Sequence, residues 1–206
     1  MWLENRKIIK MDIYKELINK VGLDIKSVGF NKYGDTFYVN KFRNWGLINF
    51  QKSRSSTSLA TLFTINLGIS SNILRQNDGI DLSKKPIIWD CHWRKRIGFI
   101  LEVKQDYWWE LTDRTDLDKL SSDVIGMLNN RGIPELNEHI NDESLISEWL
   151  NNVGSGLTEL QIYVNLTTIL KLKGSDTLSE VIEAIRKQIS KGCKESFEIH
   201  IKDLLE

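Results

Sequence analysis

The chain of 206 residues is long enough for one large domain, or for one domain with a helical extension. Its 28 Lys and Arg residues balance 28 Asp and Glu residues, which excludes a uniform electrostatic attraction to nucleic acid or to an anionic membrane. A content of 41% hydrophobic and 27% charged residues, with only 2 prolines, is typical of a globular protein and excludes low-complexity and collagen-like chains.

The first 70 residues change from a helical to a strand-like pattern. Asp12 can cap a helix whose apolar residues recur every three or four positions between Ile13 and Val28, and Gly29 suits the left-handed position that ends it. Alternation of period two then predicts three strands, over 36–42, 47–53 and 62–69. With a turn at 44–46 and a polar connection at 53–58, these strands form an antiparallel meander.

The second part of the chain returns to a helical pattern. Residues 70–90 hold turn signals without a period, and a connection of this length is uncommon unless it is functional or mobile. Further strands are expected over 91–97, 99–103 and 107–111. Helices follow from Thr115 onward, and glycines are expected to end three of them: Gly132, Gly154 and Gly174. Either Asn141 or Asp142 caps the helix that is expected to end at Gly154. A capping box at Thr177-Leu-Ser-Glu180 opens a further helix, and residues 193–206 fit a short helix or a strand.

One helix, a run of strands and a run of helices predict an α+β fold. We expect an antiparallel meander of about five to six strands, with an N-terminal helix and a C-terminal run of helices packed on one face. Three regions are expected along the chain: an N-terminal extension over 1–10, an α+β core over 11–130, and a helical C-terminal extension over 131–206 packed on the core.

Charge is unevenly distributed along the chain. Residues 1–104 hold 18 Lys and Arg against 9 Asp and Glu, whereas residues 105–160 hold 3 against 12. Either the acidic helices neutralise the basic sheet within the molecule, or a basic face remains available to an acidic partner. The sequence leaves both alternatives open.

The alternation of each strand sorts its residues onto two faces. Apolar residues that share a parity predict a core on the face covered by helices: Phe63, Ile65, Leu67, Trp93 and Trp109. Amides, arginines and aromatic residues, which are enriched at recognition surfaces, have the opposite parity. We therefore expect a binding surface on the polar face, edged by residues 53–58 and 70–90 and made of Asn49, Gln51, Arg54, Asn66, His92, Arg94, Arg96 and Trp108.

No catalytic residue, metal site or cofactor is expected. The three histidines form no pair at helical spacing and join no cysteine pair, so a zinc site has no support. Cys91 and His92 are adjacent on a strand, and their side chains would therefore point to opposite faces rather than form a nucleophile–base pair. The acidic run Asp113, Asp116 and Asp118 lacks the spacing of a calcium-binding loop.

We expect a cytoplasmic protein. The N-terminus carries charges where a signal peptide needs an apolar run, and no stretch of about 18 apolar residues suggests a membrane span. Two distant cysteines, Cys91 and Cys193, do not form a disulfide framework, although one long-range disulfide between them is an alternative.

Five segments in this order resemble the domain of unknown function 4304 family: 29–38 (GFNKYGDTFY), 48–54 (INFQKSR), 63–69 (FTINLGI), 91–98 (CHWRKRIG) and 106–110 (DYWWE). The resemblance covers roughly residues 11–130. It implies a small cytoplasmic bacterial protein of unassigned role, and it supplies no catalytic residues.

The functional expectation is a non-enzymatic binding or interaction module that uses the polar face of the sheet. Its partner would be an acidic protein or a phosphate-bearing ligand; neither a membrane nor a nucleic acid is expected. The alternative is an enzyme or small-ligand binder that acts on a phosphorylated or nucleotide-like molecule held by Arg94, Arg96 and His92. A deep pocket around these residues favours a ligand, and a flat face favours a protein partner.

Overall fold

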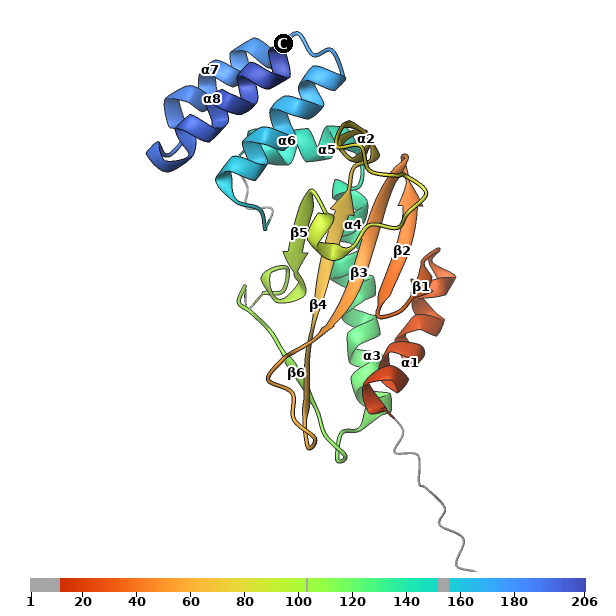
Figure 1. The fold of residues 1–206 in the computed structure, drawn as a ribbon. Helices are drawn as coiled ribbons and strands as arrows, with labels where there is room; N and C mark the ends of the chain where they lie inside the picture. Colours follow the sequence, from red (N-terminus) through yellow and green to blue (C-terminus); the bar gives the residue numbers. More distant parts are fainter. Residues whose placement is uncertain (1–11, 103, 152–155) are drawn as a thin grey trace, which may run out of the picture.

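The computed structural model describes residues 12–102, 104–151 and 156–206 and has the predicted α+β fold (Figure 1). The six strands are β1 (Asn31–Tyr33), β2 (Thr36–Lys41), β3 (Asn44–Lys52), β4 (Thr61–Ser70), β5 (Trp93–Arg96) and β6 (Trp109–Leu111). The α-helices are α1 (Ile13–Ser27), α2 (Asn72–Asn77), α3 (Leu117–Met127), α4 (Ile133–His139), α5 (Asp142–Leu150), α6 (Glu159–Leu172), α7 (Leu178–Gln188) and α8 (Lys191–Leu205). Two short 3₁₀ helices, η1 (Ile88–Asp90) and η2 (Ile97–Phe99), flank β5, and a π-helical turn, η3 (Leu128–Gly132), joins α3 to α4. The predicted extension over 1–10 lies outside the described residues.

The sheet is antiparallel throughout, in the order β1-β2-β3-β4-β5, and β6 also pairs with β4. Strands β5 and β6 follow one another along the same edge of β4, because β3 occupies its other edge. The predicted strand over 99–103 is wrong for its described part, since the chain forms η2 and then a turn. The backbone folds tightly there: a Cβ on Gly98 would lie 2.1 Å from the Gln105 carbonyl oxygen.

The turn between β2 and β3 lies earlier than the sequence predicted. Asn44, Trp45 and Gly46 are the first residues of β3, and the turn consists of Phe42 and Arg43, whose φ angles are 51° and 67°. Two-residue hairpins favour positive φ at both central positions, because that geometry matches the twist of the strands. Here hairpin geometry overrides the turn preference of the Asn-Trp-Gly sequence.

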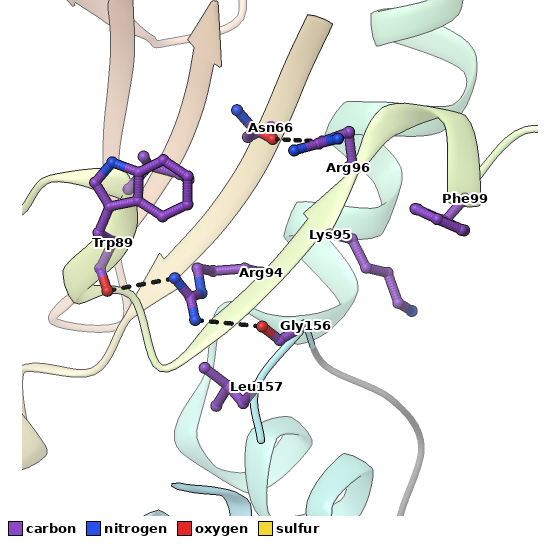
Figure 2. Close-up of a pocket in the computed structure, with 9 residues that line it drawn as sticks. Asn66, Trp89, Arg94, Lys95, Arg96, Phe99, Gly156 and Leu157 are labelled. Carbon is purple, nitrogen blue, oxygen red and sulfur yellow. Dashed lines mark hydrogen bonds between the residues drawn. The ribbon is translucent and has the colours of Figure 1, made fainter. Parts of the chain in front are cut away.

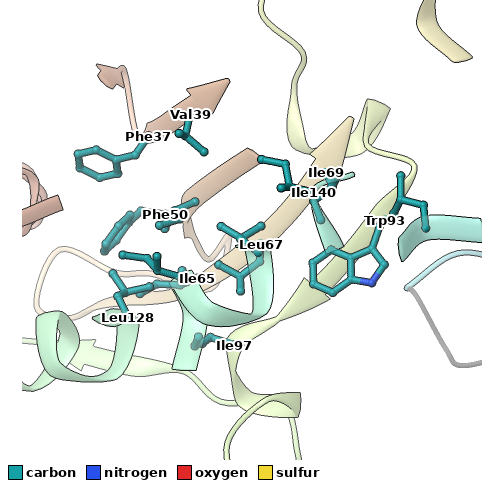
Figure 3. Close-up of a cluster of buried hydrophobic side chains, with 14 of the residues drawn as sticks. Phe37, Val39, Phe50, Ile65, Leu67, Ile69, Trp93, Ile97, Leu128 and Ile140 are labelled. Atoms are coloured by element: carbon teal, nitrogen blue, oxygen red, sulfur yellow. The ribbon is translucent and has the colours of Figure 1, made fainter. Parts of the chain in front are cut away.

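The apolar face of the sheet forms the core with α1, α3 and α4, as the alternation predicted (Figures 1 and 3). Phe63, Ile65, Leu67 and Trp93 have no exposed surface, and Trp109 is 7% exposed. The Phe63 ring stacks on Trp109 at a centroid distance of 5.1 Å. The core assignment is confirmed.

The helical region differs from the prediction at Gly132. This glycine does not end a helix, because α3, the π turn and α4 form one helical run. The π turn ends two residues before Pro134, whose ring would clash with the Asn130 carbonyl in a regular α-helix. The predicted boundary between residues 130 and 131 falls inside this run, and the division into domains stays a prediction.

Helices α5, α7 and α8 begin close to their predicted positions. Asn141 caps α5, Thr158 and Gln161 form a capping box at α6, and Gly174 ends α6 with a φ of 64°. Thr177 precedes α7 without the predicted side-chain cap, and the last segment is the helix α8. Helices α6, α7 and α8 lie beyond one end of the sheet (Figure 1). The predicted stop at Gly154 is outside the described residues.

Candidate functional site

A row of polar side chains crosses three strands on the face opposite the core. Strand register places Asn66 of β4 between Asn49 of β3 and Arg96 of β5. The Asn66 amide donates to Gln51 Oε1 at 2.8 Å and to Asn49 Oδ1 at 3.3 Å, and its Oδ1 accepts from Arg96 Nε at 3.3 Å. Asn49 in turn donates to Thr36 Oγ1 at 2.8 Å. These bonds fix the orientation of each amide in the row.

Arg96 is held by an acid that the sequence analysis did not single out. Its Nη1 donates to Asp106 Oδ2 at 2.6 Å, and the same oxygen accepts from Trp108 Nε1 at 3.0 Å. The guanidinium also lies over the Trp108 ring at 5.3 Å. Burial alone would raise the pKa of Asp106, but the bonds from Arg96 and Trp108 outweigh it, so the pKa lies below its usual value. Arg96 is therefore neutralised and fixed in place.

Arg94 has a different environment, although it shares the face with Arg96. Its guanidinium donates to two backbone carbonyls, of Trp89 at 3.5 Å and of Gly156 at 3.3 Å (Figure 2). Both bonds are long. Its Nε is buried without a hydrogen-bond partner, and no carboxylate of the described residues lies within salt-bridge distance of it. Arg94 is consequently a cation with unused hydrogen-bonding capacity.

A cavity of about 680 Å³ opens around these arginines. Figure 2 shows Arg94 and Arg96 between Trp89 on one side and Phe99 on the other. Trp89 is 61% and Phe99 53% exposed. The cavity is lined by Asn66, Ile88, Trp89, Arg94, Lys95, Arg96, Phe99, Gly156 and Leu157. A second hollow of about 360 Å³ lies over β2 and β3, and Ile88 and Trp89 line both hollows. We call the two together the groove.

The connection over 70–90 positions one wall of the groove. Arg75 is buried and donates to Asn72 Oδ1 and to the carbonyls of Asp81 and Lys84, which ties this loop to α2. Ile88 then packs with Cys91 over Gly68 in a small second core that also contains Tyr38 and Leu47. The loop therefore covers part of the polar face and directs Trp89 into the groove.

Three residues of the expected surface do not line the groove: Trp108, which lies against Arg96, His92 and Arg54. His92 is buried, and its Nδ1 accepts a hydrogen bond from the Ser71 amide at 3.1 Å. Burial, with a smaller contribution from the Arg75 cation, lowers the pKa of His92 to about 4, so the ring is neutral at pH 7. Arg54 is exposed in the β3–β4 connection and is not among the lining residues of either hollow.

Lys95, next to both arginines, points mainly to the opposite face. Its Nζ pairs with Glu135 at 2.8 Å and with Glu148 at 3.7 Å, both from the acidic segment. Lys20 pairs with Asp118 in the same way. The acidic helices thus neutralise lysines of the basic half, whereas Arg94 has no such partner among the described residues.

The structure offers little for covalent or metal chemistry at the groove. Within residues 12–102, 104–151 and 156–206, no three His, Cys, Asp or Glu side chains are grouped as a metal site. Cys91 and Cys193 are both free thiols, and burial raises the pKa of the Cys91 thiol.

In the described segments, no helix has the length and apolar character needed to cross a bilayer.

Sequence reasoning missed Trp89, Phe99, Asp106 and the backbone at Gly156. Trp89 and Phe99 lie in 3₁₀ turns, where strand parity says nothing about direction. A large aromatic residue in an aperiodic polar loop was a usable signal for Trp89. Asp106 precedes a Trp-Trp pair, but only the fold shows that it faces Arg96.

A family model described as "Domain of unknown function (DUF4304)" matches residues 21–138. The chain belongs to this family. No match was found among curated proteins or solved structures. The family match contains both arginines and the amide row, whereas Gly156 and Leu157, which complete the cavity, lie beyond it.

Proposed function

We propose that this protein is a non-catalytic binding protein, and that its groove holds the phosphate group of a small ligand at Arg94. The observation that carries the proposal is the partial use of the Arg94 guanidinium: two long bonds to carbonyls and a buried Nε without a partner. A charged acceptor in the cavity would form shorter, charge-assisted hydrogen bonds with the Nη1 and Nη2 donors, which make only these two long bonds among the described residues.

Concavity supports a ligand over a flat protein interface. A cavity of about 680 Å³ lies within the size range typical of small-molecule sites. Its wall combines exposed aromatic rings, Trp89 and Phe99, with a guanidinium. Arg presents a planar fork that matches the oxygens of a phosphate or carboxylate.

Residue chemistry supports binding rather than catalysis. Among the described residues that line the cavity at Arg94, none is a Cys, His, Ser, Asp or Glu that could serve as nucleophile or general base. His92, which the enzyme alternative requires as a ligand-holding residue, is buried and bonded to the Ser71 amide.

Isothermal titration with inorganic pyrophosphate tests the proposal. The wild type should bind, Arg94→Ala should weaken binding at least about tenfold, and the residual affinity should depend less on salt. Arg54→Ala, an exposed arginine outside the groove, is the matched control and should bind like the wild type. Equal affinity in Arg94→Ala and the wild type would refute the proposal. Binding of a Glu-rich peptide with no binding of pyrophosphate would show that the partner is an acidic protein.

A further inference from the structure

The two hollows of the groove share one exposed aromatic side chain. Trp89 lines both the cavity at Arg94 and the hollow over β2 and β3, and it is 61% exposed. On one side of Trp89 lie the arginines. On the other side lie the amides of Asn49 and Gln51. A ligand that fills both hollows would contact Trp89 near its middle.

We propose that the ligand is a mononucleotide, with its phosphate at Arg94 and its base stacked on Trp89. The inference rests on the proposed phosphate site and goes further by naming what the phosphate is attached to. Every nucleobase has a flat face that stacks on an indole ring.

The second hollow supplies hydrogen-bonding groups suited to the edge of a base. Gln51 Oε1 accepts from Asn66, and within the described residues its amide nitrogen makes no hydrogen bond. That nitrogen is a donor whose orientation is already fixed by the amide row. Asn49 lines the same hollow, and among the described residues its Oδ1 accepts only one long bond, from Asn66, so it can accept another. Donor, acceptor and stacking surface therefore lie in one hollow, while the phosphate-binding cation lies in the next.

The backbone at Trp89 is held by contacts within the protein. Ile88 beside it is 7% exposed and packs closely over Gly68. A Cβ added at Gly68 would lie 2.6 Å from the Ile88 side chain. The Trp89 carbonyl accepts from Arg94, and the Arg94 guanidinium lies 5.9 Å from the Trp89 ring. Stacking surface and phosphate site are thus adjacent.

The test compares ligands that share a phosphate. AMP, GMP and UMP are titrated into the full chain beside ribose 5-phosphate, which lacks the base. At least one nucleotide should bind about tenfold or more tightly than ribose 5-phosphate, the gain expected for one stacked base. Trp89→Ala should weaken nucleotide binding more than ribose 5-phosphate binding, so that the gain disappears, and Trp89→Phe should keep most of it.

Each outcome separates this inference from the proposed function. Equal affinities for the nucleotides and ribose 5-phosphate in the wild type would overturn the inference while leaving the phosphate site intact. A nucleotide preference that persists in Trp89→Ala would overturn the placement of the base. If neither pyrophosphate nor any sugar phosphate binds, the proposed function fails as well. The wild-type comparison needs no variant, so it remains decisive even if a substitution at Trp89 disturbs the fold.

Discussion

The two arginines of the groove should respond differently to truncation. Arg96→Ala removes a salt bridge whose side chains are 28% and 45% exposed, which is worth about 0.5–1 kcal/mol at such a partly exposed site. It also removes the stacking on Trp108, worth about 0.5–1 kcal/mol, and the donor to Asn66 Oδ1, worth about 0.5–1 kcal/mol. We therefore expect Arg96→Ala to lower the free energy of unfolding by about 2 kcal/mol.

Arg94→Ala is the matched control, because it removes an arginine from the same strand and face. Arg94 makes only long bonds to carbonyls and has no carboxylate partner among the described residues, so the expected loss is under about 1 kcal/mol. Urea denaturation with a common m-value measures both variants. A double-mutant cycle of Arg96→Ala with Asp106→Asn should give a coupling energy of about 1 kcal/mol. A coupling near zero, or equal losses for the two arginine variants, would refute this reasoning.

The same pair predicts a dependence on pH. The pKa of Asp106 is below its ordinary value of 3.8 in the folded protein, so the unfolded chain binds the proton more readily. The stabilisation from ionised Asp106 is therefore complete when the pH is above the pKa of the unfolded chain, and it disappears as the pH falls through the pKa of the folded protein. The difference in stability between the wild type and Arg96→Ala should shrink below pH 4.

Three further substitutions test the core, the buried histidine and the tight turn. Phe63→Ala should cost about 3–5 kcal/mol in urea denaturation, because the ring is fully buried, whereas Leu59→Ala, 82% exposed, should cost under about 0.5 kcal/mol. The pKa of His92 is about 4 in the folded protein against 6.5 in the unfolded chain, so the wild type should lose up to about 3 kcal/mol of stability as the pH falls from 6.5 to 4. The variant His92→Asn keeps an acceptor for the Ser71 amide but has no titrating ring, and it should lose less over the same pH range. Gly98→Ala should lower the thermal midpoint by several degrees, because its Cβ would meet the Gln105 carbonyl at 2.1 Å; an unchanged midpoint would contradict this backbone path.

Parity along single strands predicted much of the fold and of the site. The period-two pattern of β3 and β4 placed Phe63 and Ile65 in the core and Asn49, Gln51 and Asn66 on the other face, as strand register shows. Such patterns are reliable because side chains in a strand alternate strictly and one face must be buried.

Parity fails wherever the backbone leaves the regular strand. The two positive φ angles at Phe42 and Arg43 follow from the twist of β2 and β3, which depends on their pairing rather than on local turn residues. Trp89 faces the groove because Ile88 and Cys91 pack over Gly68, a contact between segments 20 residues apart. His92 shares the parity of Arg94 but lies at the end of its strand, where Ser71 and the buried Arg75 enclose it.

The distinction between Arg94 and Arg96 shows where sequence reasoning about a charged surface stops. Both have the same parity, both lie on β5, and both belong to the basic half of the chain. What separates them is Asp106, which is ten residues from Arg96 along the chain and reaches it only because the backbone doubles back at Gly98. Net charge by segment therefore gives the excess of cations over acids, while the fold decides which cations are paired within the protein. Arg94 has no carboxylate partner among the described residues, and the backbone carbonyls that accept from it belong to Trp89 of η1 and to Gly156, which precedes α6. Under the proposed function, a ligand bound at Arg94 would therefore contact both β5 and the segment that leads into α6.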